Sequence, residues 1–187
     1  MNRKIILASK SPRRNELMKM AGFDFTVDSK NVEENHPAGL APELIPASLA
    51  AKKAKAFLPL ADDDTIVIGA DTIVILDGVI YEKPNDRQHA IDMLAVLSGK
   101  MHEVVTGVCI LSNKKEVVFS ETTKVYFNPF TLAEIEYYVD KYKPFDKAGS
   151  YACQEWIGAI GIKKFDGDYF NVVGLPINRV YQELKKF

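Results

Sequence analysis

The sequence has little of what marks several large protein classes. Its 187 residues include only two cysteines, Cys109 and Cys153, and three histidines, none with the spacing of a zinc site. A disulfide scaffold is not expected, and both cysteines are predicted to be small core residues in a reducing compartment. No apolar run approaches the roughly 20 residues of a membrane span. These absences favour a cytoplasmic protein without a membrane partner.

An excess of charge of one sign is also lacking. Lysine and arginine number 24 and aspartate and glutamate 25, which gives a formal net charge of -1. Proteins that grip nucleic acid usually carry a basic surplus, so no nucleic-acid partner is expected. A small anionic ligand remains compatible, because a few local cations can bind it. The glycine-rich phosphate loops of P-loop and Rossmann proteins are both missing, which excludes those two classes.

Strand-like and helix-like segments alternate along the chain. Apolar residues 5–8 and 65–70 predict buried strands, and Asp77-Gly78 predicts a tight hairpin turn. Thr131 with Glu134 forms a capping box that opens a helix. Hairpins and crossovers together predict an α/β or α+β body with a mixed sheet flanked by helices. The length fits one domain over residues 1–187.

Residues 9–14, Ser-Lys-Ser-Pro-Arg-Arg, join the first predicted strand to a helix start. Ser11 is placed to cap that helix and Pro12 to occupy its first position. Backbone N–H groups and the helix dipole favour an anion there. Arg13 and Arg14 carry the wrong charge for the dipole, which an anion bound between them and the helix end would explain. A solvated basic turn is the alternative.

Asp71 directly follows the apolar residues 65–70, so it is expected at the end of a buried strand. Strand ends that meet a cleft often carry ligand or catalytic groups. A carboxylate there can hold Mg²⁺ or accept a proton from an attacking water, and a turn-forming aspartate is the alternative. We expect Asp71 to share one cleft with Arg13 and Arg14.

Five segments, taken in order, resemble the Maf family of nucleoside triphosphate pyrophosphatases: residues 7–14, 69–74, 82–84, 97–99 with 106–108, and 146–149. The similarity runs from residue 5 to about residue 178. It implies a curved mixed sheet with two lobes around a central cleft, similar to the inosine-triphosphatase-like fold. It also implies a hydrolase that converts a nucleoside triphosphate and water to the monophosphate and pyrophosphate, and a homodimer.

The resemblance assigns roles to individual residues. Triphosphate binding falls to Ser9, Arg13, Arg14, Lys53 and Lys83, with Lys52 as the alternative to Lys53. Asp71 is implied to be the proton acceptor, and Glu33 and Lys83 to act beside it. A divalent metal, Mg²⁺ with Mn²⁺ or Co²⁺ as alternatives, is implied at Asp71 and Glu33, with Glu34 as the alternative to Glu33.

Three positions carry base preference in this resemblance. Arg13, Thr72 and Gln154 match the branch that acts on dTTP and UTP, which can include modified pyrimidine triphosphates. A glutamine amide both donates and accepts, which suits the carbonyl and N–H edge of uracil or thymine. Attack of water at the α-phosphorus is our hypothesis. The alternative function is a nucleotide-binding regulator of cell division and septum formation whose hydrolysis is weak or incidental.

Overall fold

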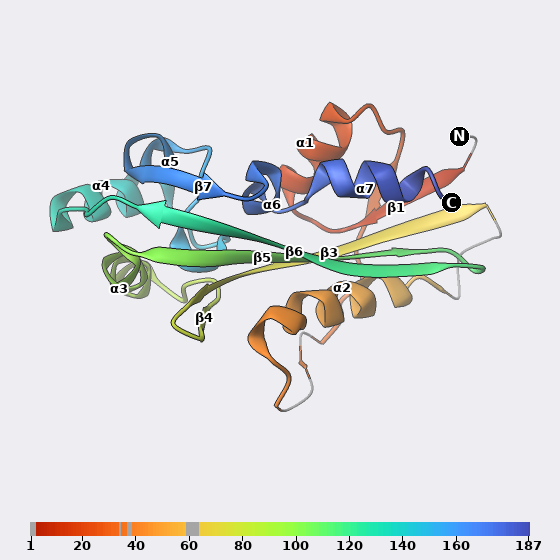
Figure 1. The fold of residues 1–187 in the computed structure, drawn as a ribbon, viewed down its shortest axis with the longest axis horizontal. Coiled ribbons are helices and arrows are strands. Elements are labelled where there is room, and N and C mark those ends of the chain that lie inside the picture. Colours follow the sequence, from red (N-terminus) through yellow and green to blue (C-terminus); the bar gives the residue numbers. More distant parts are fainter. Residues whose placement is uncertain (1–2, 34, 37–38, 59–63) are drawn as a thin grey trace. The chain divides into compact units, whose positions relative to one another are not determined.

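Figure 1 shows the structure, a computed structural model that describes residues 3–33, 35–36, 39–58 and 64–187. Its strands are β1 (Lys4–Ala8), β2 (Thr26–Asp28), β3 (Thr65–Leu76), β4 (Val79–Tyr81), β5 (Met101–Leu111), β6 (Glu116–Phe127) and β7 (Ile162–Asp166). The helices are α1 (Pro12–Met20), α2 (Ile45–Lys55), α3 (Arg87–Leu97), α4 (Leu132–Tyr142), α5 (Trp156–Gly161), α6 (Tyr169–Val173) and α7 (Ile177–Leu184). The part of the chain that the structure describes also contains the 3₁₀ helices η1 (Pro42–Leu44) and η3 (Ala148–Ser150).

The strands form one mixed sheet. Neighbouring strands follow the order β2-β1-β3-β5-β6-β7, and β4 pairs with β3. β1 pairs in parallel with β2 and with β3, whereas the β3–β4 and β6–β7 pairs are antiparallel. Parallel neighbours need crossover connections, and antiparallel neighbours can be joined by short turns. The expected mixed α/β architecture is therefore confirmed.

The chain divides into two compact units, and each unit combines segments that are not contiguous in the sequence. The first unit comprises Met1–Thr72, Thr106–Glu121 and Gly174–Phe187, and the second comprises Ile73–Val105 and Thr122–Val173. The divisions fall inside β3, β5 and β6, so these three strands contribute residues to both units.

In the first unit, α2 lies on one face of the strands and α1 and α7 on the other (Figure 1). The approach of α2 is so close that two strand positions admit no side chain. A Cβ atom at Gly69 would lie 2.3 Å from the carbonyl oxygen of Ala50, and one at Gly107 would lie 2.1 Å from the backbone nitrogen of Ala47. These two glycines therefore show which face of β3 and of β5 is turned to α2.

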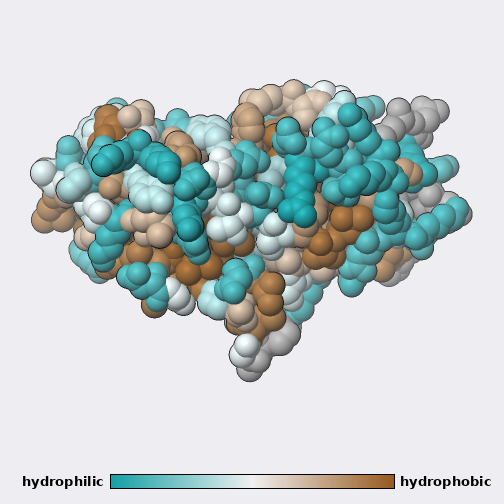
Figure 2. All heavy atoms as spheres, viewed as in Figure 1, coloured by the Kyte–Doolittle hydropathy of each residue, from teal (hydrophilic) through white to brown (hydrophobic). Residues whose placement is uncertain are grey.

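The first-unit helices follow the expected local rules. Ser11 caps α1, since its side chain accepts from the backbone N–H of Arg14, and Pro12 is the first helical residue. In α7, Ile177, Val180 and Leu184 are buried, the spacing of one apolar helical stripe. Figure 2 shows mainly hydrophilic residues on the surface over α7. The stripe therefore faces the strands.

The second unit has its own apolar core, in which α3 packs against α4. The predicted hairpin turn is confirmed, because Asp77 and Gly78 have φ angles of 52° and 77°. The capping box of Thr131 and Glu134 is present at the start of α4. No helix among the described residues is long and apolar enough to span a membrane.

Both cysteines are buried thiols, as the sequence predicted. Burial raises the pKa of the Cys109 thiol to about 12. A thiol with such a pKa stays protonated at neutral pH and is a poor nucleophile. Cys109 therefore serves as a small apolar residue, beside Ala50 and Val67 in the core of the first unit.

His102 is a buried titratable group in the second unit. Its side chain is 1% exposed, and its Nε2 lies 2.7 Å from the hydroxyl of Tyr151. The ring packs edge-on against Phe127, with 4.7 Å between centroids. Burial lowers the pKa of His102 from 6.5 to about 4. The folded protein therefore holds this ring neutral, as the hydrogen bond to Tyr151 allows.

We predict that this burial makes stability fall as the pH is lowered from 6.5 toward 4. In this window the unfolded chain binds a proton at His102 and the folded chain does not, so protonation favours unfolding. The loss of unfolding free energy should reach about 3 kcal/mol by pH 4. Denaturant unfolding of the wild type and His102→Gln across this range measures it.

The difference in unfolding free energy between wild type and His102→Gln should shrink as the pH falls. His89→Gln makes the same substitution at a half-buried histidine of α3 and is the control for the exchange itself. Parallel curves for wild type and His102→Gln would contradict the prediction.

Candidate active site

The turn after β1 is organised around Ser9, which is 8% exposed. The chain leaves β1 at Ala8 and enters α1 at Pro12. The hydroxyl oxygen of Ser9 accepts from the backbone N–H of Ser11, at 3.2 Å. This hydrogen bond tightens the strand-to-helix turn and fixes the position of the Ser9 hydroxyl.

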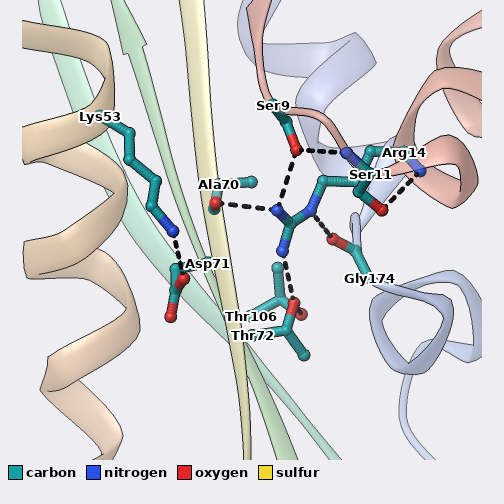
Figure 3. A network of polar contacts seen from close by, with 9 residues as sticks. All are labelled: Ser9, Ser11, Arg14, Lys53, Ala70, Asp71, Thr72, Thr106 and Gly174. Atoms are coloured by element: carbon teal, nitrogen blue, oxygen red, sulfur yellow. Dashed lines mark hydrogen bonds and ion pairs between the residues drawn. The ribbon is translucent and has the colours of Figure 1, made fainter. Parts of the chain in front are cut away.

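Arg14 ties three segments of the first unit together (Figure 3). Its Nε donates to the carbonyl oxygen of Gly174 at 2.8 Å, and its Nη1 donates to the carbonyl oxygen of Ala70 at 3.0 Å. Nη1 also donates to the hydroxyl of Ser9 at 3.2 Å, and Nη2 donates to that of Thr72 at 3.0 Å. The planar guanidinium, with five donors, suits several acceptors at once. These oxygens stabilise a cation in the first turn of α1.

Asp71 forms an ion pair with Lys53 of α2. Lys53 Nζ lies 2.6 Å from Oδ1 of Asp71, and the two side chains are only 20% and 14% exposed. Successive strand side chains point to opposite faces, so Asp71 points to the same face as Gly69, the face turned to α2. The neighbouring Lys52 contacts Asn35 instead, so Lys53 is the lysine that meets Asp71.

One expectation about Asp71 is corrected. Asp71 does not end a strand, because β3 runs without a break from Thr65 to Leu76. The side chains of Arg14 and Asp71 lie on opposite faces of β3. Thr72, next to Asp71, points to the opposite face and meets Arg14, and Figure 3 shows Lys53 and Asp71 on one side of β3 and Arg14 on the other.

The edge of β3 changes its neighbour close to Asp71. β1 pairs with β3 from Lys4 opposite Thr65 to Leu7 opposite Ile68. β3 then continues past the end of β1, and the carbonyl oxygen of Ala70 accepts from the Arg14 side chain.

Thr72 is half-buried, and its hydroxyl meets a second hydroxyl besides Arg14. The Oγ1 atoms of Thr72 and Thr106 lie 2.9 Å apart, and Thr106 is wholly buried in β5. The face of the sheet that meets Arg14 thus carries two hydrogen-bonded threonine hydroxyls, one on β3 and one on β5.

The other predicted site residues lie as follows. Arg13 is half-buried in the first turn of α1, and Glu33 is exposed, with its Oε2 accepting from Asn35 Nδ2 at 2.9 Å. Glu34 lies outside the described residues. Lys83 and Gln154 are exposed residues of the second unit, and Gln154 Oε1 lies 3.6 Å from the thiol of Cys153.

The carboxylates of Asp71 and Glu33 offer the oxygen ligands that Mg²⁺ prefers. The ion pair with Lys53 uses Oδ1 of Asp71 and leaves Oδ2 outside that contact. Within the described residues, no group of three or more His, Cys, Asp or Glu side chains is placed to hold a metal ion. Mg²⁺ commonly combines one or two carboxylates with waters and substrate phosphates, and the Asp71 carboxylate fits the part of one such ligand.

Sequence reasoning missed three contributors to this site. The carbonyl oxygens of Ala70 and Gly174 bind Arg14, and the hydroxyl of Thr106 binds Thr72. Backbone acceptors leave no side-chain signal in a sequence. The one indication of Thr106 in the sequence was its place in residues 106–108, a segment of the family resemblance.

These features define an α/β protein with an arginine-bearing strand-to-helix turn beside a strand whose aspartate pairs with a lysine of the neighbouring helix. The profile of the Maf-like protein family matches residues 4–187, and the chain belongs to this family.

Relatives with high identity cover nearly the whole chain. A dTTP/UTP pyrophosphatase of Phocaeicola vulgatus is 49% identical over 184 residues, which are 98% of this chain and 95% of the relative. A dTTP/UTP pyrophosphatase of Cytophaga hutchinsonii is 48% identical over 186 residues, 99% of this chain and 84% of the relative. Among solved structures, the Ham1 protein of Staphylococcus aureus aligns with a TM-score of 0.49 and 16% identity over 66% of this chain and 71% of that chain.

Proposed function

We propose that this chain hydrolyses dTTP and UTP, and modified pyrimidine triphosphates, to the nucleoside monophosphate and pyrophosphate. Family membership and the names of relatives at 48–49% identity support this activity. The structural observation that carries it is the ion pair between Lys53 of α2 and Asp71 of β3. The residue before Asp71, Ala70, accepts a hydrogen bond from Arg14. Both side chains of the ion pair are largely buried, so the carboxylate can take a proton and the ammonium group can stabilise negative charge away from bulk water.

The charge of the substrate determines what the site must supply. A triphosphate brings about four negative charges, and more charge moves onto the leaving pyrophosphate in the transition state. Lys53 and the strand-to-helix turn with Arg13 place cations near Asp71 and Ser9. In the proposal these cations stabilise the developing charge, and the resemblance adds Lys83. Arg14 contributes by positioning Ser9, because it donates a hydrogen bond to the Ser9 hydroxyl.

Asp71 is proposed to accept a proton from the water that attacks the α-phosphorus. The contact with Lys53 orients its carboxylate, which is the group that would take the proton. Asp71 and Glu33 would also hold Mg²⁺, which when bound supplies charge neutralisation at the phosphate oxygens. Base selection is proposed for Arg13, Thr72 and Gln154, and the acting form is proposed to be a cytoplasmic homodimer.

A substrate panel in ¹⁸O water tests this function. Purified protein with Mg²⁺ is expected to release pyrophosphate from UTP and dTTP much faster than from ATP, GTP or CTP. The label should appear in the monophosphate, because water attacks the α-phosphorus. Orthophosphate from every nucleotide would indicate a general phosphatase, and label in pyrophosphate would move the attack to another phosphorus. Either result contradicts the proposal.

A further inference from the structure

We infer that Thr106 is a positioning residue for base selection, because it fixes the direction of the Thr72 hydroxyl. The inference rests on the proposed function, in which Thr72 contacts the base. Thr106 lies in β5, is 0% exposed, and has its Oγ1 2.9 Å from Oγ1 of Thr72. A wholly buried hydroxyl cannot touch the ligand itself, so it acts through a side chain that it contacts, here Thr72.

The backbone fixes which way Thr106 points. The next residue, Gly107, lies against the start of α2, where a Cβ would meet the backbone of Pro46 and Ala47 at 2.1 Å. Neighbouring residues in a strand point to opposite faces. Thr106 therefore points away from α2, to the face on which Thr72 meets Arg14. The close packing of Gly107 prevents this strand from turning Thr106 elsewhere.

The charge of Arg14 determines the direction of one of the two hydrogen bonds of Thr72. A guanidinium has only donors, so the Thr72 oxygen must accept from Nη2 of Arg14, at 3.0 Å. A hydroxyl has two acceptor lone pairs and one proton. Either hydroxyl of the Thr72–Thr106 pair can be the donor. In our inference Thr106 donates to the second lone pair of Thr72, and the Thr72 proton then meets the ligand. Thr72 is half-buried, so a ligand can reach it.

With Thr106 as the donor, Thr72 acts as a donor toward the base. Uracil and thymine carry a carbonyl oxygen at C4, where cytosine carries an amino group. A fixed O–H donor pairs with the carbonyl and is left facing a second donor when the amino group takes its place. The Arg14–Thr72–Thr106 chain thus favours a uracil or thymine nucleotide over a cytosine nucleotide.

The test compares Thr106→Val, which removes the donor at nearly constant shape, with Thr106→Ser, which keeps it. The ratio of kcat/KM for UTP over CTP is measured, and also the ratio of Kd for UTP and CTP analogues with a methylene bridge between the α- and β-phosphorus. Thr106→Val should lower both preferences for uracil by roughly tenfold, the worth of one ordinary hydrogen bond. Thr106→Ser should keep the wild-type preference. Thermal melting confirms folding, and Thr106→Ala replaces Thr106→Val if that variant does not fold.

The outcomes separate this inference from the proposed function. An equal fall for UTP and CTP in Thr106→Val would show a merely structural threonine and overturn the inference, while hydrolysis by the wild type upholds the function. A wild type that hydrolyses nothing but prefers the UTP analogue, with that preference lost in Thr106→Val, upholds the inference and rejects the function. A wild type without any preference for uracil overturns the inference.

Discussion

Replacing Asp71 by asparagine is expected to lower kcat for UTP by about 10²- to 10⁴-fold, the usual range for loss of a general base. Asparagine keeps the shape of the side chain but has no charge for Lys53, which lies 2.6 Å from Oδ1 in the wild type. It also cannot take a proton from water. The Kd of a UTP analogue with a methylene bridge should change little, because the phosphates are bound mainly by other groups. Steady-state kinetics and calorimetry measure the two effects.

The matched control for Asp71→Asn is Glu116→Gln. Glu116 pairs with Lys55, another lysine of α2, at 2.8 Å, but on an exposed surface. Loss of that pair should leave kcat unchanged, since exposed ion pairs contribute little. Undiminished turnover by Asp71→Asn would remove this carboxylate from the mechanism. Recovery of activity at raised Mg²⁺ or Mn²⁺ would show a metal ligand that is not the base.

The start of α1 could be predicted from sequence because it obeys local rules. A serine before a proline, next to an apolar run, fixes a cap, a first helical residue and a buried strand within a few positions. The structure has all three at Ser11, Pro12 and β1. The same holds for the hairpin at Asp77-Gly78, where the turn chemistry is local.

The course of β3 could not be predicted in the same way. Asp71 and Thr72 interrupt an apolar run, and two polar residues ordinarily indicate a turn or a strand end. Here each polar side chain has a partner from a distant segment, Lys53 for Asp71 and Arg14 for Thr72. Long-range pairing therefore keeps the strand continuous, and no local pattern contains that information.

The two arginines of α1 show a similar limit. Sequence reasoning treated their charges as unfavourable at a helix start and inferred an anion. Arg14 meets four oxygens of the protein itself. Two of these belong to backbone carbonyls more than 50 residues away, at Ala70 and Gly174. The electrostatic argument identified an unusual position correctly, but it could not separate a ligand from a structural partner.

Arg14→Lys is accordingly expected to lower the melting temperature by about 5 to 15 °C. Lysine keeps the charge but lacks the planar fork, so it cannot serve Gly174, Ala70 and Thr72 together. Part-buried carbonyls without their donor cost about 1–3 kcal/mol each, and in a chain of this size each kcal/mol shifts the melting temperature by about 2–4 °C. Calorimetry with and without a methylene-bridged UTP analogue measures the loss.

Arg13→Lys is the matched control, because it makes the same change one residue earlier in α1. If Arg13 binds phosphate and Arg14 stabilises the fold through its hydrogen bonds, Arg13→Lys should raise KM for UTP with a small change in melting temperature. Arg14→Lys should lose much stability, and its kcat/KM for UTP should also fall at temperatures where the variant is folded. The fall follows because Ser9 and Thr72 lose the guanidinium that positions their hydroxyls. An Arg14→Lys variant that melts like the wild type but binds the analogue weakly would instead make Arg14 a direct phosphate ligand.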